Sequence, residues 1–203
     1  MQLNKADRMK LAKPSFIRES LKLAADSSLI CFAGGNPDPA YFPWKEISAA
    51  ADIAIQDSWR VVLQYSVTEG NVKLRSQLQR MMHDIGIETP ISQLIITNGS
   101  QQGLDLISKV FINKGDKVIV ESPTYMGAIN AMKYYEPEFI EVETDENGMR
   151  MDSLSKALEV NSNVKFIYTI PDFQNPTGNV LAEDRRIKMI ELAEKHNVMI
   201  VED

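Results

Sequence analysis

The sequence predicts an α/β fold, in which a mostly parallel β-sheet carries helices on both faces. From residue 94 onward, short apolar runs rich in Val and Ile alternate with longer segments whose apolar residues recur at helical spacing. Gly, Pro, Asn or Asp bound each run, as is typical of strands. Sheets of this kind bind ligands at the carboxyl ends of their strands. The segments that follow the strands are therefore where we look for function.

The elements follow in order along the chain. Strands are predicted for the apolar runs at 94–97, 117–120, 139–142, 164–169 and 198–202. Helices are predicted between them at 100–112, 125–134, 152–158 and 183–196. Further helical patterns lie at 15–25, 44–58 and 72–85. Before residue 90 the chain therefore reads as an irregular arm and helices, not as a second independent domain.

Composition excludes several classes of function. The 203 residues are 44% hydrophobic and 25% charged, as in ordinary globular proteins, and need no disulfide or metal to fold. A net charge of −6 with no basic run longer than a pair argues against nucleic-acid binding. A single cysteine, Cys31, fits a reducing compartment. No membrane span or signal core is visible, so we expect a soluble cytoplasmic protein, with no metal site predicted.

Residues 97–103, Thr-Asn-Gly-Ser-Gln-Gln-Gly, follow a predicted strand and open a helix. A flexible Gly99 lets backbone N–H groups converge, and the positive end of the helix dipole attracts an anion, most often a phosphate. Ser100 adds a hydroxyl donor. The alternative is plain N-capping by Asn98 or Ser100, which is the favoured interpretation of this segment taken alone.

Two further loops carry polar or aromatic groups to the same edge of the sheet. Residues 121–125, Glu-Ser-Pro-Thr-Tyr, place Tyr125 at a helix start, where it can stack on a flat heteroaromatic ring or simply pack on a neighbouring loop. Residues 171–178, Pro-Asp-Phe-Gln-Asn-Pro-Thr-Gly, fix the side-chain amide of Asn175 beside a proline. A plain turn needs fewer specified residues. The Asn175–Pro176 bond is a candidate cis peptide.

Asp203 follows the last apolar run. A carboxylate in that place suits pairing with the protonated nitrogen of a pyridine ring, which keeps the ring cationic and able to accept electrons. The alternative is that Asp203 caps a following helix.

Together these segments resemble the fold-type I, pyridoxal phosphate (PLP)-dependent aminotransferases of the class I/II group. The nearest branch contains the 2-aminoadipate and kynurenine aminotransferases. The resemblance spans essentially the whole chain, and the motifs that carry it, in order, are 32–39, 63–66 with Gly70 and 74–75, 97–102, 121–125 and 171–178.

The resemblance implies roles for particular residues. Ser100 and Gln101 would bind the cofactor phosphate, and Tyr125 would stack on the pyridine ring. Asn175 would hydrogen-bond the 3-oxygen of the ring and lie near the substrate carboxylate. Asp203 would pair with the pyridine nitrogen.

The resemblance also implies an assembly and a domain division. Tyr65 would reach the phosphate of a neighbouring subunit, so a homodimer is expected. Gly34 and Gly35 would lie beside the substrate. Residues 1–43 would form an N-terminal arm and substrate-side loop, and residues 44–203 the first part of the PLP-binding large domain.

A lysine that forms the Schiff base with the cofactor is expected beyond Asp203, so the large domain would be incomplete at the C-terminus and residues 1–203 alone inactive. Lys165 and Lys188 match no such position and are expected on solvated faces.

The function that follows is transfer of an amino group from an amino acid to a 2-oxo acid through PLP. Three alternatives stay open: a PLP-dependent β-lyase on the same fold, an aminotransferase-like effector domain of a transcription regulator, and a non-catalytic fragment. The first would release ammonia instead of transferring the amino group, and the second would need a DNA-binding domain in front.

Overall fold

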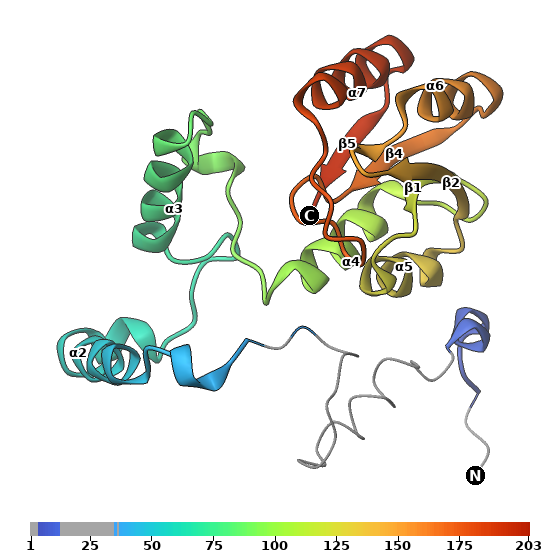
Figure 1. The fold of residues 1–203 in the computed structure, drawn as a ribbon. Helices are drawn as coiled ribbons and strands as arrows, with labels where there is room; N and C mark the ends of the chain where they lie inside the picture. The colour runs from blue at the N-terminus through green and yellow to red at the C-terminus, as the bar shows by residue number, and fades with distance from the viewer. Residues whose placement is uncertain (1–3, 13–34, 36) are drawn as a thin grey trace, which may run out of the picture. The chain divides into compact units, whose positions relative to one another are not determined.

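The computed structural model describes residues 4–12, 35 and 37–203 (Figure 1). The chain divides into two compact units, one within residues 1–12 and 98–203 and the other within 13–97. The helix predicted at 15–25 and the expected substrate contact Gly34 lie outside the described residues. The division into an arm over 1–43 and a large domain over 44–203 stays a prediction.

The larger unit is built on a five-stranded sheet in the order β3-β2-β1-β4-β5. The strands are β1 (Lys117–Ser122), β2 (Glu138–Asp145), β3 (Gly148–Met149), β4 (Val164–Thr169) and β5 (Met199–Glu202). Every neighbouring pair is parallel except β2 with β3, which is antiparallel. The mostly parallel sheet is therefore confirmed. The two-residue β3 is too short for the sequence to show any periodicity.

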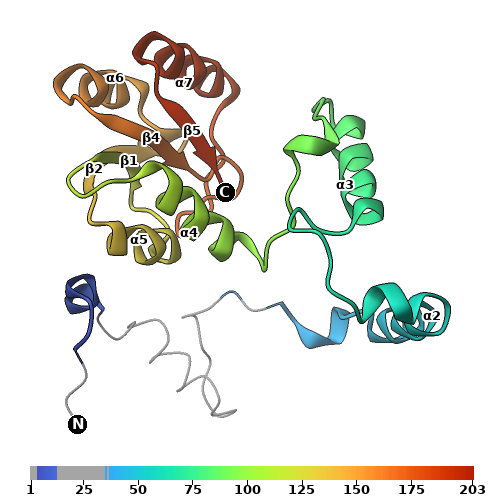
Figure 2. The same ribbon diagram turned by 180° about the vertical axis from the view of Figure 1, so that it is seen from behind.

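Helices cover both faces of this sheet, as predicted (Figures 1 and 2). They are α4 (Ser100–Phe111), α5 (Met126–Met132), α6 (Met151–Val160) and α7 (Glu183–His196). The same unit also contains the short 3-10 helices η1 (Asp7–Leu11) and η4 (Lys133–Tyr135), which contact each other. Side chains alternate along β1: Val118 and Val120 pack in the core with α4 and α5, and Ile119 packs in the opposite core with α6 and α7. Burial on both faces explains why the strands read as continuous apolar runs.

The apolar run at 94–97 is not a strand, so that prediction is wrong. The backbone N–H of Ile96 donates to the carbonyl of Glu69 at 3.0 Å, but no described strand pairs with the segment. A run of apolar residues becomes a strand only where another strand supplies a ladder of hydrogen bonds, and the apolar pattern does not reveal that partner.

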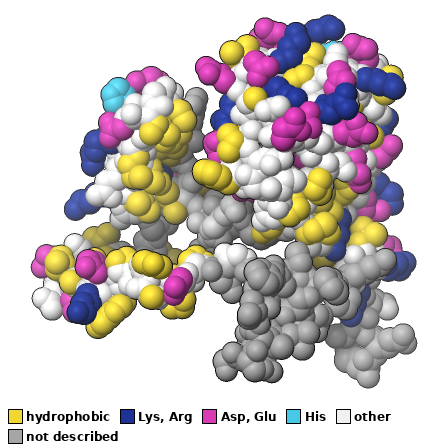
Figure 3. All heavy atoms as spheres, viewed as in Figure 1, with side chains coloured by type: hydrophobic (Ala, Val, Ile, Leu, Met, Phe, Trp, Pro, Cys, Tyr) yellow, Lys and Arg dark blue, Asp and Glu magenta, His cyan; other side chains and the backbone are white. Residues whose placement is uncertain are grey.

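The smaller unit contains η2 (Pro39–Tyr41), α2 (Trp44–Val62), α3 (Val72–Asp84) and η3 (Ile91–Gln93). Arg75 of α3 is 9% exposed and joins the segments that precede and follow this helix. Its Nε donates to the carbonyl of Gly70 at 3.2 Å, and its Nη1 donates to the carbonyl of Ile91 at 3.1 Å. Figure 3 shows hydrophobic side chains on the exposed surfaces of α2 and α3, and charged ones over α6 and α7. Among the helices that the structure describes, none is long and apolar enough to cross a membrane.

Candidate functional site

The carboxyl ends of β1, β4 and β5 adjoin, because these strands are parallel neighbours in the sheet. The chain leaves them as the segment 122–125, the segment 170–178 and Asp203. The predicted residues Tyr125, Asn175 and Asp203 are therefore brought to one edge of the sheet. This is the edge at which open α/β sheets bind their ligands.

The amino end of α4 belongs to the same edge. Gln101 Nε2 donates to the carbonyl of Gly127 at 3.0 Å, which ties α4 to the first turn of α5. Gly99 precedes α4 with a φ of 79°, a left-handed conformation that favours glycine. The N-cap residue is Gly99, and among the described residues neither the Asn98 nor the Ser100 side chain makes a capping bond, so capping by these residues, the favoured interpretation of the segment alone, is wrong. The side chain of Gln102 instead accepts from the backbone N–H of Asn98 at 2.6 Å. Ser100 and Gln101 are both exposed at the helix start.

Tyr125 is half-buried and immediately precedes α5. Its ring lies against Gly127, where an added Cβ would collide with the ring carbons and the hydroxyl oxygen. Glycine at this position lets the ring lie across the first turn of the helix. The ring is thereby placed beside the amino end of α4, because Gln101 bonds to the same Gly127.

Asn175 lies at an exposed turn of the loop that follows β4. The Asn175–Pro176 peptide bond is cis, as predicted, and a second cis bond, Ser122–Pro123, was not anticipated. Within the part of the chain that the structure describes, the Asn175 side chain makes no hydrogen bond, while its neighbour Gln174 is 4% exposed and fully engaged. The amide of Asn175 is therefore open to a ligand.

Asp203 is an exposed carboxylate held by two bonds to β4. Its Oδ2 accepts from the hydroxyl of Tyr168 at 2.8 Å, and its backbone N–H donates to the carbonyl of Thr169 at 3.2 Å. Tyr168 is fully buried, and burial, followed by the hydrogen bond to Asp203, raises the pKa of its hydroxyl far above the ordinary value. The hydroxyl thus stays a donor and fixes one oxygen of the carboxylate.

The sequence did not identify Glu121 as part of the site, although it is 2% exposed beneath the loops. Its Oε1 accepts from Thr169 Oγ1 at 2.8 Å, and its Oε2 accepts from Gln174 Nε2 at 3.0 Å and from the backbone N–H of Ile170 at 3.4 Å. Burial raises the pKa of this carboxyl, and the three donors partly offset the effect. The available signal was an acidic residue that directly continues the apolar run 118–120.

Stability should depend on pH through Glu121. Because its pKa is raised above the ordinary value of 4.5, the stability that the protonated carboxyl contributes is present below pH 4.5 and is lost as the pH rises through the folded-state pKa. In Glu121→Gln this dependence is absent. We expect the free energy of unfolding of the wild type, minus that of the variant, to fall as the pH rises above 4.5 in urea titrations.

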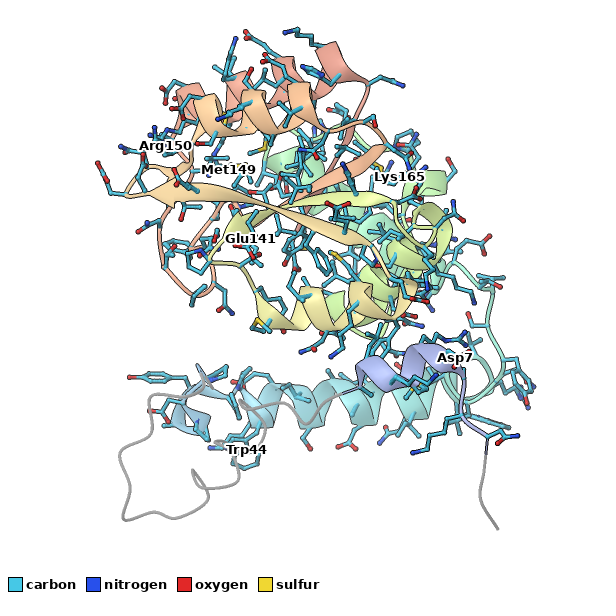
Figure 4. The ribbon with its side chains drawn as sticks, turned by 90° about the vertical axis from the view of Figure 1, so that its right-hand side faces the viewer. Asp7, Trp44, Glu141, Met149, Arg150 and Lys165 are labelled. Carbon is cyan, nitrogen blue, oxygen red and sulfur yellow. The ribbon has the colours of Figure 1, made fainter. Side chains whose placement is uncertain are left out.

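The same substitution at Glu141, an exposed residue of β2 (Figure 4), controls for the loss of one negative charge. Parallel pH profiles for wild type and Glu121→Gln would contradict the prediction.

Other predicted residues lie apart from this edge or in the smaller unit. Tyr65 is 99% exposed, and an added Cβ on the exposed Gly35 would meet nothing within 4 Å, so their expected contacts stay predictions. Lys165 lies at the amino end of β4, and its Nζ is 3.4 Å from Asp116 Oδ2. Figure 4 shows Lys165 and Met149 at opposite ends of the sheet. Lys188 pairs with Glu191 on α7, as expected for a solvated helix face.

No group of three or more His, Cys, Asp or Glu side chains that could hold a metal ion occurs among residues 4–12, 35 and 37–203.

Comparison with known proteins identifies the family. The aminotransferase class I and II profile matches residues 33–203, and the chain belongs to this family. It is 44% identical to aromatic-amino-acid aminotransferase 1 of Thermococcus litoralis over 94% of this chain and 47% of that protein. The expected fold and family are thereby confirmed.

Two solved structures show the same fold and represent the predicted branch. Kynurenine aminotransferase of Pyrococcus horikoshii, in complex with PMP, superposes with a TM-score of 0.91 at 38% identity over 98% of this chain and 50% of that one. An alpha-aminoadipate aminotransferase of Thermus thermophilus, complexed with N-(5'-phosphopyridoxyl)-L-leucine, gives a TM-score of 0.86 at 36% identity, with coverages of 98% and 48%. The chain spans about half the length of the relatives it matches.

Proposed function

We propose that the full-length protein containing this chain is a PLP-dependent aminotransferase, and that residues 98–203 form the part that cradles the cofactor. The observation that carries the proposal is the convergence of Tyr125, Asn175 and Asp203 at the carboxyl edge of β1, β4 and β5. The complexes of the two similar structures with PMP and a phosphopyridoxyl amino acid support the choice of cofactor.

The groups present at this edge fit a phosphorylated pyridine. The amino end of α4 offers backbone N–H groups and the Ser100 hydroxyl, which suits a phosphate. Tyr125 offers an aromatic ring, and Asn175 offers an amide with no partner among the described residues. Asp203 offers a carboxylate oxygen for a protonated ring nitrogen, since Tyr168 holds the other.

Each residue has a separate task in this proposal. Ser100 and Gln101 bind the phosphate, Tyr125 covers the ring, and Asn175 donates to its 3-oxygen near the substrate carboxylate. Asp203 holds a proton on the ring nitrogen. PLP itself supplies the electron sink that amino-group transfer requires.

The finer parts of the proposal rest on the family resemblance. The lysine that bonds to the cofactor lies outside residues 1–203, Gly34 and Gly35 adjoin the substrate, and Tyr65 reaches the phosphate of the other subunit in a homodimer. The substrates are an amino acid and a 2-oxo acid. A cytoplasmic location is supported by composition instead, since the single Cys31 fits a reducing compartment.

Binding and turnover by the full-length protein test this function. We expect stoichiometric PLP binding in an absorbance titration and amino-group transfer from aromatic or 2-aminoadipate donors to a 2-oxo acid. Asn175→Ala should raise the Kd for PLP about 10-fold or more, because one hydrogen bond to a charged group contributes ~1.5–3 kcal/mol.

Asn147→Ala, at an exposed turn between β2 and β3, is the matched control and should leave the Kd unchanged. Ammonia release without amino-group transfer would favour the β-lyase, and PLP binding without either reaction would favour the regulator or a non-catalytic role. Absence of PLP binding would overturn the proposal.

A further inference from the structure

We infer that Glu121 and Gln174 are positioning residues, which together set the spacing of Tyr125, Asn175 and Asp203 around the cofactor. Neither side chain is accessible enough to be the principal ligand of a cofactor, since they are 2% and 4% exposed. The inference rests on the proposed function. It adds to that function the two buried side chains that fix the relative positions of the binding groups.

Gln174 is the centre of the loop that carries Asn175. Its Nε2 donates to Glu121 Oε2 at 3.0 Å and to the carbonyl of Pro123 at 2.8 Å. Its Oε1 accepts from the backbone N–H of Thr177 at 2.9 Å and from the Thr177 hydroxyl at 2.8 Å. Its own backbone N–H and carbonyl also bond within the loop, to residues 179 and 178. Every polar group of Gln174 is therefore used.

These bonds reach two of the proposed binding residues. Asn175 directly follows Gln174, so the bonds that hold Gln174 also fix the position of the backbone from which the Asn175 side chain extends. Pro123 lies two residues before Tyr125, so the bond from Gln174 to its carbonyl joins the Asn175 loop to the Tyr125 segment. The distance between the two loops is thus set through one buried side chain.

Glu121 extends the connection to the third binding residue. Its Oε1 accepts from the Thr169 hydroxyl at 2.8 Å, and the carbonyl of Thr169 accepts from the backbone N–H of Asp203 at 3.2 Å. The network therefore runs from the end of β1 across the end of β4 to the end of β5.

Stability alone does not account for this arrangement. A carboxylate removed from water loses several kcal/mol of hydration, and a well-packed apolar side chain in its place is often as stable or more so. Asn175, by contrast, has no hydrogen bond of its own within the described chain, so its placement depends on its neighbours. Precise placement of binding groups requires supporting residues of this kind.

The chain contains a control for the loss of an amide–carboxylate bond between these strands. At the opposite edge of the same two strands, the buried Asp116 just before β1 accepts from the amide of Asn163 just before β4. Gln174→Ala and Asn163→Ala each remove an amide from a buried carboxylate joining the same two strands. Both variants should unfold at a lower temperature than the wild type.

In the full-length protein we expect Gln174→Ala to raise the Kd for PLP ~10-fold or more and to weaken the visible circular dichroism of the bound cofactor. Asn163→Ala should change the Kd for PLP less than about 2-fold, because a distant site that is independent of the cofactor has no larger effect on its binding. Gln174→Glu, which keeps the size of the side chain but sets a carboxyl against Glu121, should act in the same direction and serves if the alanine variant does not fold.

Equal weakening by Gln174→Ala and Asn163→Ala would show a merely structural role and overturn the inference. So would PLP binding that is unchanged in both Gln174 variants while Asn175→Ala impairs it, and in that case the proposed function would stand. A wild-type protein that binds no PLP would overturn the proposed function and this inference with it.

Discussion

Asp203→Asn in the full-length protein is expected to lower kcat/KM for amino-group transfer roughly 10- to 150-fold, since a hydrogen bond to a charged group contributes ~1.5–3 kcal/mol and each 1.36 kcal/mol is tenfold in rate. The amide of asparagine still accepts from the Tyr168 hydroxyl, so the local structure is kept. It carries no negative charge, however, and cannot hold a proton on the nitrogen of the pyridine ring.

Steady-state kinetics with a fixed amino donor measure this effect. The matched control is Glu202→Gln, which removes a negative charge from the neighbouring exposed residue of β5. We expect the control to keep kcat/KM within about 2-fold, because exposed charges contribute little. An equal loss of kcat/KM in both variants would mean that the negative charge of this region as a whole matters, not Asp203 in particular. An unchanged kcat/KM in Asp203→Asn would remove Asp203 from the proposed site.

The elements that the sequence predicted well are those whose pattern is local. The helix expected at 183–196 has those bounds in the structure, and the strand expected at 164–169 does too. The run at 94–97 looked equally like a strand, but strand formation depends on a partner elsewhere in the chain. Local patterns therefore predicted which residues are buried and at what spacing they recur, but not which segments pair as strands.

The same limit applies to the site. Tyr125 and Asn175 were visible because each lies in a segment of turn residues after an apolar run, and Asp203 because it directly follows such a run. The order of strands then brings the three together. Glu121 and Gln174 were not singled out, because their importance comes from a mutual bond across 53 positions of sequence. A buried polar residue shows its role only when its partners are known.

The scaffold under the site should depend strongly on Phe166. This side chain is fully buried in the middle of β4, where its backbone pairs with Val118 of β1 and Met199 of β5. It packs in the core that α4 and α5 cover. Phe166→Ala should lower the free energy of unfolding by about 3–5 kcal/mol, the usual effect of such a truncation in a core.

Phe111→Ala is the matched control, because Phe111 lies on α4 and is 44% exposed, so the same truncation removes far less buried area. Urea titrations of the full-length protein measure the difference as a shift in midpoint at an unchanged slope. A loss of 3–5 kcal/mol is a large share of the ~5–15 kcal/mol that holds a typical protein folded. Because β4 leads directly into the loop that carries Asn175, PLP affinity should fall in Phe166→Ala and stay constant in Phe111→Ala. Similar midpoints for the two variants would mean that the core between β4 and the helices α4 and α5 is not what supports this edge of the sheet.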